Sequence, residues 1–171
     1  MGANEQGADA THGRWLTIPR TLCFVLNGDD VLLMKRAANR RVFPNQYNGV
    51  GGHIERDEDP WSSAKREILE ETGLQVRDLS LCAIYNIDAG QATGIFLLVF
   101  TCYSDSREVQ SDTREGTLHW VPRDTVHQLD LVEDLPHILP RILDRGDTQP
   151  PLYVHASYDQ DDQLLMRFAE A

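Results

Sequence analysis

Apolar residues alternate with polar ones, or gather in short runs, along most of the chain, and this pattern predicts β-strands. The runs at 19–26 and 31–35 flank Asn27-Gly28-Asp29-Asp30, which is typical of a tight turn between antiparallel strands. The other strands are expected at 79–87, 93–103, 117–121, 152–157 and 164–168, with the last two forming a hairpin. The polar stretch 104–116 predicts an exposed connection.

Two segments carry helical signals. The clearer one is 60–72, because Asp59 suits the N-cap, Pro60 the first helical position and Gly73 the position after the last turn. A second helix is expected at 135–144. Strands and helices alternate irregularly along the chain, which indicates an α+β fold with a mixed sheet.

The segment between the second strand and the first helix differs from both. Residues 36–46 show no apolar period and predict a loop, whereas 47–54 predict a short glycine-rich strand that another backbone or a ligand can approach closely. The whole chain has 171 residues, 41% of them hydrophobic, which is enough for one buried core. We therefore expect a flexible N-terminal segment over 1–16 and a single domain over 17–171.

Charge narrows the range of partners. The 27 Asp+Glu against 16 Lys+Arg give a net charge of −11, the opposite of the basic surface that binds long DNA or RNA. Small phosphorylated ligands remain compatible with this charge, because divalent cations bridge carboxylates to phosphates. The polar start lacks a signal core, and the longest apolar run, 95–100, is too short to span a bilayer. A soluble, cytoplasmic protein without a membrane partner is expected.

The cysteines favour the same compartment. Cys23, Cys82 and Cys102 are odd in number, widely spaced and set in apolar stretches rather than in metal-binding pairs. We expect them to be buried, reduced thiols.

The helix predicted at 60–72 has two distinct faces. At ~100° per residue, one side carries Trp61, Ala64 and Ile68, and an arc of about 100° elsewhere carries Glu67, Glu70 and Glu71. Like charges at this spacing cost roughly 0.2–0.5 kcal/mol per pair unless a cation or Arg66 offsets them. An all-oxygen set suits Mg²⁺ or Mn²⁺ and not Zn²⁺. The alternative is an ordinary solvated face.

The surrounding pattern decides between these two interpretations. From Gly52 the sequence continues with five residues, Glu58, seven residues and then Arg66-Glu67-Ile68-Leu69-Glu70-Glu71-Thr72-Gly73-Leu74. This pattern resembles the Nudix box of the Nudix hydrolase superfamily at every defined position. The resemblance implies a Nudix α/β/α sandwich in which the box forms a loop–helix–loop unit.

The resemblance also implies roles for the box residues. In the family, the matching glutamates hold the metals with help from a glycine carbonyl and an earlier glutamate, which here are Glu67, Glu70, Glu71, Gly52 and Glu58. Arg66 would orient a glutamate through a bidentate ion pair. Metal-activated water would then attack a phosphorus of a diphosphate linkage. Glu115 is a candidate general base in this scheme, and its alternative is an ordinary surface glutamate.

Beyond the box, the chain resembles the MutT-like branch that hydrolyses oxidised purine nucleoside triphosphates to monophosphate and pyrophosphate. The likeness rests on Tyr47-Asn48-Gly49-Val50-Gly51-Gly52, on the spacing of Glu115 and Trp120, and on the C-terminal hairpin. It implies that Asn48 hydrogen-bonds the purine and that Glu133 and Asp134 recognise the base edge. Their structural alternatives are a turn at Asn48 and acidic residues favoured at a helix start.

Several alternatives stay open at this stage. Lys35, Arg36, Arg40 and Arg41 either bind the triphosphate or form a solvated edge. The substrate is either a nucleoside triphosphate or another diphosphate, such as a sugar nucleotide, a dinucleotide or a pterin triphosphate. A non-catalytic nucleotide sensor is disfavoured because every box glutamate is present. Monomer and homodimer are both compatible with the sequence.

Overall fold

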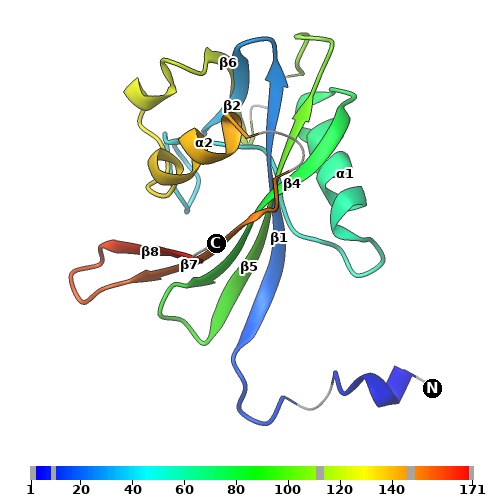
Figure 1. Ribbon diagram of the computed structural model, residues 1–171, viewed down its shortest axis with the longest axis vertical. Helices are drawn as coiled ribbons and strands as arrows, with labels where there is room; N and C mark the ends of the chain where they lie inside the picture. The colour runs from blue at the N-terminus through cyan, green and yellow to red at the C-terminus, as the bar shows by residue number, and fades with distance from the viewer. Residues whose placement is uncertain (1–2, 9–10, 111–113, 146–148, 170–171) are drawn as a thin grey trace.

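The computed structural model describes residues 3–8, 11–110, 114–145 and 149–169, and within them a mixed sheet lies between two helices (Figure 1). The strands are β1 (Leu16–Asn27), β2 (Asp30–Arg36), β3 (Tyr47–Asn48), β4 (Arg77–Asp88), β5 (Thr93–Tyr103), β6 (Gly116–Pro122), β7 (Leu152–Tyr158) and β8 (Leu164–Phe168). The helices are α1 (Pro60–Thr72) and α2 (Leu135–Leu143), with short 3₁₀ turns η1 (Ala3–Gln6) and η2 (Val126–Gln128).

The strand order is β3-β2-β1-β5-β4-β7-β8, with β6 also paired to β2. The β1–β5 and β4–β7 pairs are parallel, and the other pairs are antiparallel. Strand β1 pairs with β2 only next to their shared turn and then diverges from it. The glycine-rich segment lies along the freed edge of β1, where Val50 bridges to Cys23 and His53 bridges to Arg20. This arrangement fixes the start of the box against the centre of the sheet.

Close packing of that segment requires glycine. Gly51 has φ +151°, and a Cβ there would lie 2.2 Å from the carbonyl oxygen of Thr21. Real Cβ atoms are not found so close to backbone, so a larger residue would push the loop away from β1. The expected strand at 47–54 is therefore a ladder only at Tyr47–Asn48, and the glycine-rich remainder makes isolated bridges.

The two faces of the sheet are each covered by one helix, and Figure 1 shows α1 and α2 on opposite sides of the strands. On one face, Ala64 and Ile68 of α1 are fully buried in a cluster with Cys23, Val25 and Phe100. On the other face, the buried residues of α2 join a cluster with strand residues, which include Phe24, Tyr85, Val99, Leu135, Ile138 and Ile142. The expected α+β class and α/β/α sandwich are confirmed.

The structure corrects details of the predicted elements. Trp61 was expected on the packing face of the first helix, but it is 50% exposed, whereas Ala64 and Ile68 are fully buried. Its indole is instead covered by the Lys65 ammonium, 4.5 Å from the ring centroid, so it lies outside the core. Helix α2 ends at Leu143, one residue before the predicted end.

The cysteines agree with the expectation, since all three are buried and free of disulfides. Among the described residues, no helix is both long and apolar enough to cross a membrane.

Candidate active site

Helix α1 is fixed at both ends by local hydrogen bonds. Asp59 Oδ1 accepts from the backbone N–H groups of Trp61 (2.9 Å) and Ser62 (3.0 Å), which satisfies donors that the first turn leaves free. Gly73 adopts a left-handed conformation at φ 76°, and its N–H donates to the carbonyl of Leu69 at 2.8 Å. These caps set the register of the acidic residues between them.

Arg66 is the centre of an acidic cluster, which consists of Glu58, Glu67, Glu70 and Glu71. Its Nη2 and Nε donate to the two oxygens of Glu58 at 2.6 and 3.0 Å, a bidentate pair. Its Nη1 donates to Glu67 Oε1 at 2.9 Å and to Glu70 Oε2 at 3.2 Å. The hydrogen bonds from Arg66 lower the pKa of Glu58 to about 2. One guanidinium therefore offsets the repulsion among three carboxylates.

Glu67 lies directly against the glycine loop. A Cβ built on Gly52 would lie 2.4 Å from Glu67 Oε1, so only a glycine leaves room for this carboxylate. The box glycine and the box glutamate are therefore packed together, as the implied metal site requires of a carbonyl and a carboxylate that share one ion.

Glu71 is a largely buried carboxylate that lies against the glycine loop. Its Oε2 accepts a hydrogen bond from the Gly51 N–H at 2.9 Å. Burial raises its pKa to about 7, and the charges of Glu67 and Glu115 act in the same direction, while the Gly51 N–H and Arg36 offset this only in part. A buried acid among acids is a position where a bound cation would stabilise the folded protein.

The acidic residues fit a hard divalent cation by their chemistry. Every glutamate in the cluster offers oxygen donors, which Mg²⁺ and Mn²⁺ prefer. Among the described residues, however, no three His, Cys, Asp or Glu side chains converge on one point in the manner of ready-made ligands. Two of these glutamates, Glu67 and Glu70, are instead paired with Arg66. Metal binding would require these carboxylates to exchange part of that ion pair for the cation.

Glu115 lies just before β6, close enough to the cluster for its charge to act on both Glu71 and Arg36. Its carboxylate is 2.8 Å from Arg40 Nη2. The structure therefore brings Glu115 toward the box glutamates, as its candidate role requires. Two of the predicted phosphate-binding residues differ in their contacts. Arg40 pairs with Glu115, whereas Lys35 is exposed, with its ammonium 5.6 Å from the Tyr47 ring centroid.

The predicted base-recognition residues Asn48 and Asp134 lie on different elements of the fold. Asn48 Oδ1 accepts from the Gly49 N–H at 2.8 Å, and Asn48 pairs in the β-ladder with Met34 of the α1-side core. Asp134 precedes α2 on the other face and makes no capping hydrogen bond with its side chain. No hydrogen bond or ion pair of the described residues joins Asn48 to Asp134. Asn48 thus makes the local contact of its turn alternative, and Asp134 stands at the helix start as its own alternative has it, although its side chain makes no capping hydrogen bond.

The surroundings of Asp134 are unusual for a carboxylate at a helix start. Burial raises its pKa to about 6, and the negative charge of Glu133 acts in the same direction. Glu133 itself accepts a hydrogen bond from the Tyr158 hydroxyl. The Tyr85 hydroxyl acts on Asp134 from the sheet below. Sequence reasoning missed Tyr85 and Tyr158, because nothing in a local pattern shows which strand residues face a distant helix.

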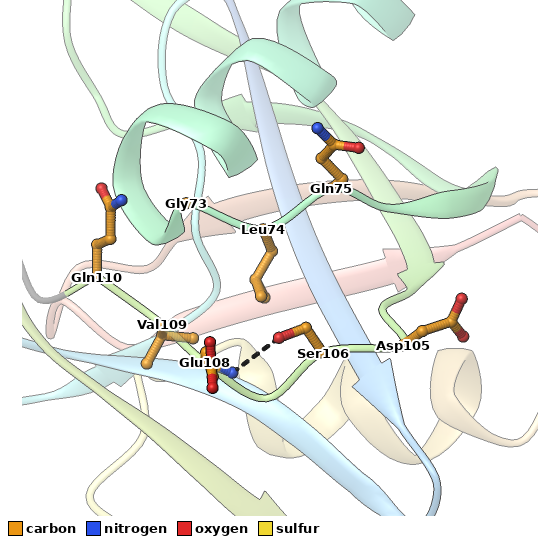
Figure 2. Close-up of a pocket in the computed structure, with 8 residues that line it drawn as sticks. All are labelled: Gly73, Leu74, Gln75, Asp105, Ser106, Glu108, Val109 and Gln110. Carbon is orange, nitrogen blue, oxygen red and sulfur yellow. Dashed lines mark hydrogen bonds between the residues drawn. The ribbon is translucent and has the colours of Figure 1, made fainter.

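A depression of about 550 Å³ lies elsewhere on the described surface. It is bounded by the C-terminal end of α1 and by residues 105–110 (Figure 2). Its lining consists of Gly73, Leu74, Gln75, Asp105, Ser106, Glu108, Val109 and Gln110. No box glutamate lines it, so this hollow is separate from the acidic cluster.

The geometry described above agrees with comparisons to known proteins. The model of the NUDIX domain matches residues 16–142. The chain therefore belongs to the Nudix family and is a Nudix hydrolase, with its architecture in the MutT-like branch. The sequence-based assignment is confirmed.

Two relatives show how far the sequence likeness extends. The nucleoside triphosphatase NudI of Enterobacter sp. (strain 638) is 30% identical over 119 residues, covering 64% of this chain and 84% of that protein. The m7GpppN-mRNA hydrolase NUDT17 of Danio rerio is 43% identical over 53 residues, covering 31% of this chain and only 18% of that protein. The second likeness is thus confined to a short segment.

Solved structures show the same fold. The MutT protein from Bacillus halodurans superposes with a TM-score of 0.74 at 28% identity, covering 88% of this chain and 97% of that one. The NUDIX domain of Shewanella oneidensis NrtR, complexed with ADP ribose, has a TM-score of 0.65 at 18% identity, covering 85% of this chain and 99% of that one. The latter likeness concerns the fold alone.

Proposed function

We propose that this Nudix hydrolase is a Mg²⁺-dependent pyrophosphohydrolase of purine nucleoside triphosphates. Its substrates are oxidised forms such as 8-oxo-dGTP or 2-hydroxy-dATP, and its products are the monophosphate and pyrophosphate. The observation that carries the proposal is the buried carboxylate of Glu71, set near Glu67 and Glu115 with only partial compensation by the Gly51 N–H and Arg36. The likeness to a nucleoside triphosphatase and a MutT protein supports the substrate class. A cytoplasmic role in cleaning the nucleotide pool follows from that substrate class.

The acidic cluster holds the metal in this proposal. The ligands are the carbonyl of Gly52 and the carboxylates of the helix and its preceding loop, namely Glu58, Glu67, Glu70 and Glu71. Bound Mg²⁺, or Mn²⁺ in its place, supplies a Lewis acid that polarises the phosphate oxygens and favours a hydroxide nucleophile. Arg66 positions Glu67 and Glu70 for that task, since its guanidinium already contacts both.

Proton transfer falls to Glu115. Its carboxylate acts on Glu71 and is held by Arg40 at 2.8 Å, so its orientation is fixed before substrate arrives. In this role Glu115 accepts the proton of the attacking water. Lys35, exposed at the end of β2, supplies positive charge to the phosphates.

Base recognition falls to Asp134, with Glu133 and Asn48 beside the base. Asp134 is half-buried, and its side chain makes no capping hydrogen bond at the start of α2. A purine edge would therefore supply hydrogen bonds that the helix start does not. For Asn48 to contribute, its side-chain oxygen must exchange the Gly49 N–H for the base. A wrong base would leave these groups unsatisfied, which is how such a site discriminates.

The test is pyrophosphate release with Mg²⁺ across normal and oxidised nucleoside triphosphates, sugar nucleotides, dinucleotides and a pterin triphosphate. Wild type is compared with Glu70→Gln, which controls for contaminating activity. Strong turnover of 8-oxo-dGTP or 2-hydroxy-dATP that the variant loses is the expected result. Turnover of another diphosphate alone would overturn the purine assignment. Nucleotide binding without any turnover would indicate a sensor instead.

A further inference from the structure

One row of residues crosses the sheet from the box loop toward α2. The β-ladder pairs His53 with Arg20, Arg20 with Leu97, and Leu97 with Tyr85. Residues paired across a ladder point to the same face of a sheet. Tyr85 belongs to the core cluster on the α2 face, so the whole row faces that side. It begins one residue after Gly52 of the proposed metal site.

Tyr85 carries an unsatisfied polar atom in this row. The residue is 1% exposed, and its hydroxyl makes no hydrogen bond of full geometry within the described part of the chain, although the Asp134 carboxylate lies close enough to interact with it. Most buried hydroxyls in proteins are paired, because leaving one unpaired costs free energy. The acidic group that acts on it is Asp134, the proposed base reader, which approaches from the start of α2.

Arg20 carries a second buried polar atom without a hydrogen-bond partner in the described part of the chain. Its Nε is buried and also has no partner among the described residues. Alternation along β1 places Arg20 on the same face as Leu22 and Phe24, both of which pack in or against the α2-side cluster. A cationic donor thus stands beside apolar neighbours on β1 and β5, with the half-buried Leu97 between it and Tyr85.

The spacing of these groups suits a nucleobase. Neighbouring strands lie about 4.8 Å apart, so Arg20 and Tyr85, two strands apart, stand roughly 10 Å from each other across Leu97. A purine lying on Leu97 would meet a donor at one edge and the Tyr85–Asp134 pair at the other. Its phosphates would then extend past His53 toward the glutamates of α1.

We propose that Arg20 and Tyr85 are specificity-determining residues that select an oxopurine, a purine ring carrying a carbonyl oxygen. The Arg20 Nε–H donates to the carbonyl oxygen, and the Tyr85 hydroxyl and Asp134 carboxyl bind the ring N–H edge. Adenine presents no carbonyl oxygen and leaves the Arg20 donor unsatisfied. This inference rests on the proposed function, because it assigns the base to a row that starts at the proposed metal site.

The test compares kcat/KM for 8-oxo-dGTP, dGTP and dATP in the wild type and three variants. Arg20→Met is expected to lower kcat/KM for the two oxopurines roughly 10- to 100-fold and to change dATP little, since a hydrogen bond from a charged donor is lost. Arg20→Lys is expected to lose the preference as well, because lysine has no Nε–H of that geometry. Tyr85→Phe is expected to lower oxopurine kcat/KM by roughly 5- to 10-fold.

Matched controls separate recognition from folding. Tyr153→Phe and Arg167→Gln alter exposed residues on the neighbouring strands β7 and β8, and both should keep the wild-type ratio between oxopurine and adenine substrates. Tyr85→Phe should also keep the melting temperature, because the buried hydroxyl that it removes makes no hydrogen bond of full geometry within the described residues. A purely structural hydroxyl would instead lower the melting temperature and leave the substrate ratio unchanged.

Each outcome bears on one of the two proposals. Equal losses of kcat/KM for all three triphosphates in Arg20→Met, restored by Arg20→Lys, would show a phosphate contact and overturn the inference alone. An unchanged ratio in both Arg20→Met and Tyr85→Phe would do the same. Absence of turnover of any triphosphate by the wild type would overturn the proposed function and this inference together.

Discussion

Arg66 holds Glu58 by both carboxylate oxygens, at 2.6 and 3.0 Å, although Glu58 precedes the N-cap of α1 and Arg66 lies within the helix. The pair ties the loop before α1 to the middle of the helix. The remaining nitrogen of the same guanidinium reaches Glu67 and Glu70. The geometry of three proposed metal ligands therefore depends on one side chain that need not touch the metal.

Replacing Arg66 by lysine tests this dependence. Lysine keeps the charge but cannot form the bidentate pair, so Glu58 and Glu67 would lose their fixed orientation. We expect the Mg²⁺ concentration at half-maximal rate to rise about 10- to 100-fold. The measurement is a Mg²⁺ titration of pyrophosphate release. Arg77→Lys, at an exposed ion pair outside the acidic cluster, serves as the control, and an Arg66→Lys curve that overlays it would contradict the role of Arg66.

A methyl group at Gly52 tests the contact with Glu67. In Gly52→Ala the added Cβ would lie 2.4 Å from Glu67 Oε1, so the carboxylate must move. A displacement of about 1 Å at a reacting centre costs on the order of 100-fold in rate, and we expect kcat to fall by that order while the fold is kept. Steady-state kinetics and circular dichroism measure the two effects. Gly28→Asn, in a hairpin turn with open space around it, should leave kcat unchanged.

Removing the charge of Asp134 is expected to stabilise the protein. The pKa of Asp134 is raised from 3.8 to about 6 in the folded state, so its contribution to stability is present below pH 3.8 and is lost as the pH rises through about 6. At pH 8, Asp134→Asn should therefore raise the free energy of unfolding by about 1–2 kcal/mol, allowing for partial solvent screening. Urea unfolding at pH 5 and pH 8 measures the difference.

The same substitution should reduce oxopurine turnover, because a side-chain amide has one acceptor oxygen and cannot accept both N–H groups of a base edge as a carboxylate does. Asp124→Asn, at an exposed position, is the matched control for stability. If Asp134→Asn destabilised the protein at pH 8 as much as at pH 5, the carboxylate would have an unrecognised structural partner and the prediction would fail.

Local signals in the sequence were sufficient for the helix of the box. The predicted range 60–72 is that of α1, because Asp59 and Gly73 are caps whose effect depends only on their neighbours in the chain. The glutamates were identified by the box pattern around them. A bidentate pair between Arg66 and one glutamate was expected from the resemblance, but its sharing among Glu58, Glu67 and Glu70 was not, since spacing does not show which carboxylates one guanidinium reaches.

Non-local relationships were not predictable in the same way. The row that joins Arg20 to Tyr85 depends on the parallel pairing of β1 with β5 and on the register of β5 with β4. Alternation tells which residues share a face of one strand but not which strands are neighbours. Arg20 in an apolar strand was a usable local signal, because a charged residue at an inward position needs a partner or a ligand.

Glu71 gives the sharpest link between metal and stability. Its pKa is raised to about 7 by burial and by the charges of Glu67 and Glu115. Without metal, the stability that Glu71 contributes is present below pH 4.5 and is lost as the pH rises through about 7, so the melting temperature should fall between about pH 4.5 and pH 7. Millimolar Mg²⁺ should reverse this fall, because it binds the ionised form and raises stability by mass action. Glu71→Gln should remove the Mg²⁺ response and the part of the pH dependence that Glu71 contributes, leaving the part from Asp134, whereas Glu108→Gln, at an exposed site, should keep both. An equal Mg²⁺ response in the two variants would show that the cation binds without Glu71 and that its burial serves packing alone.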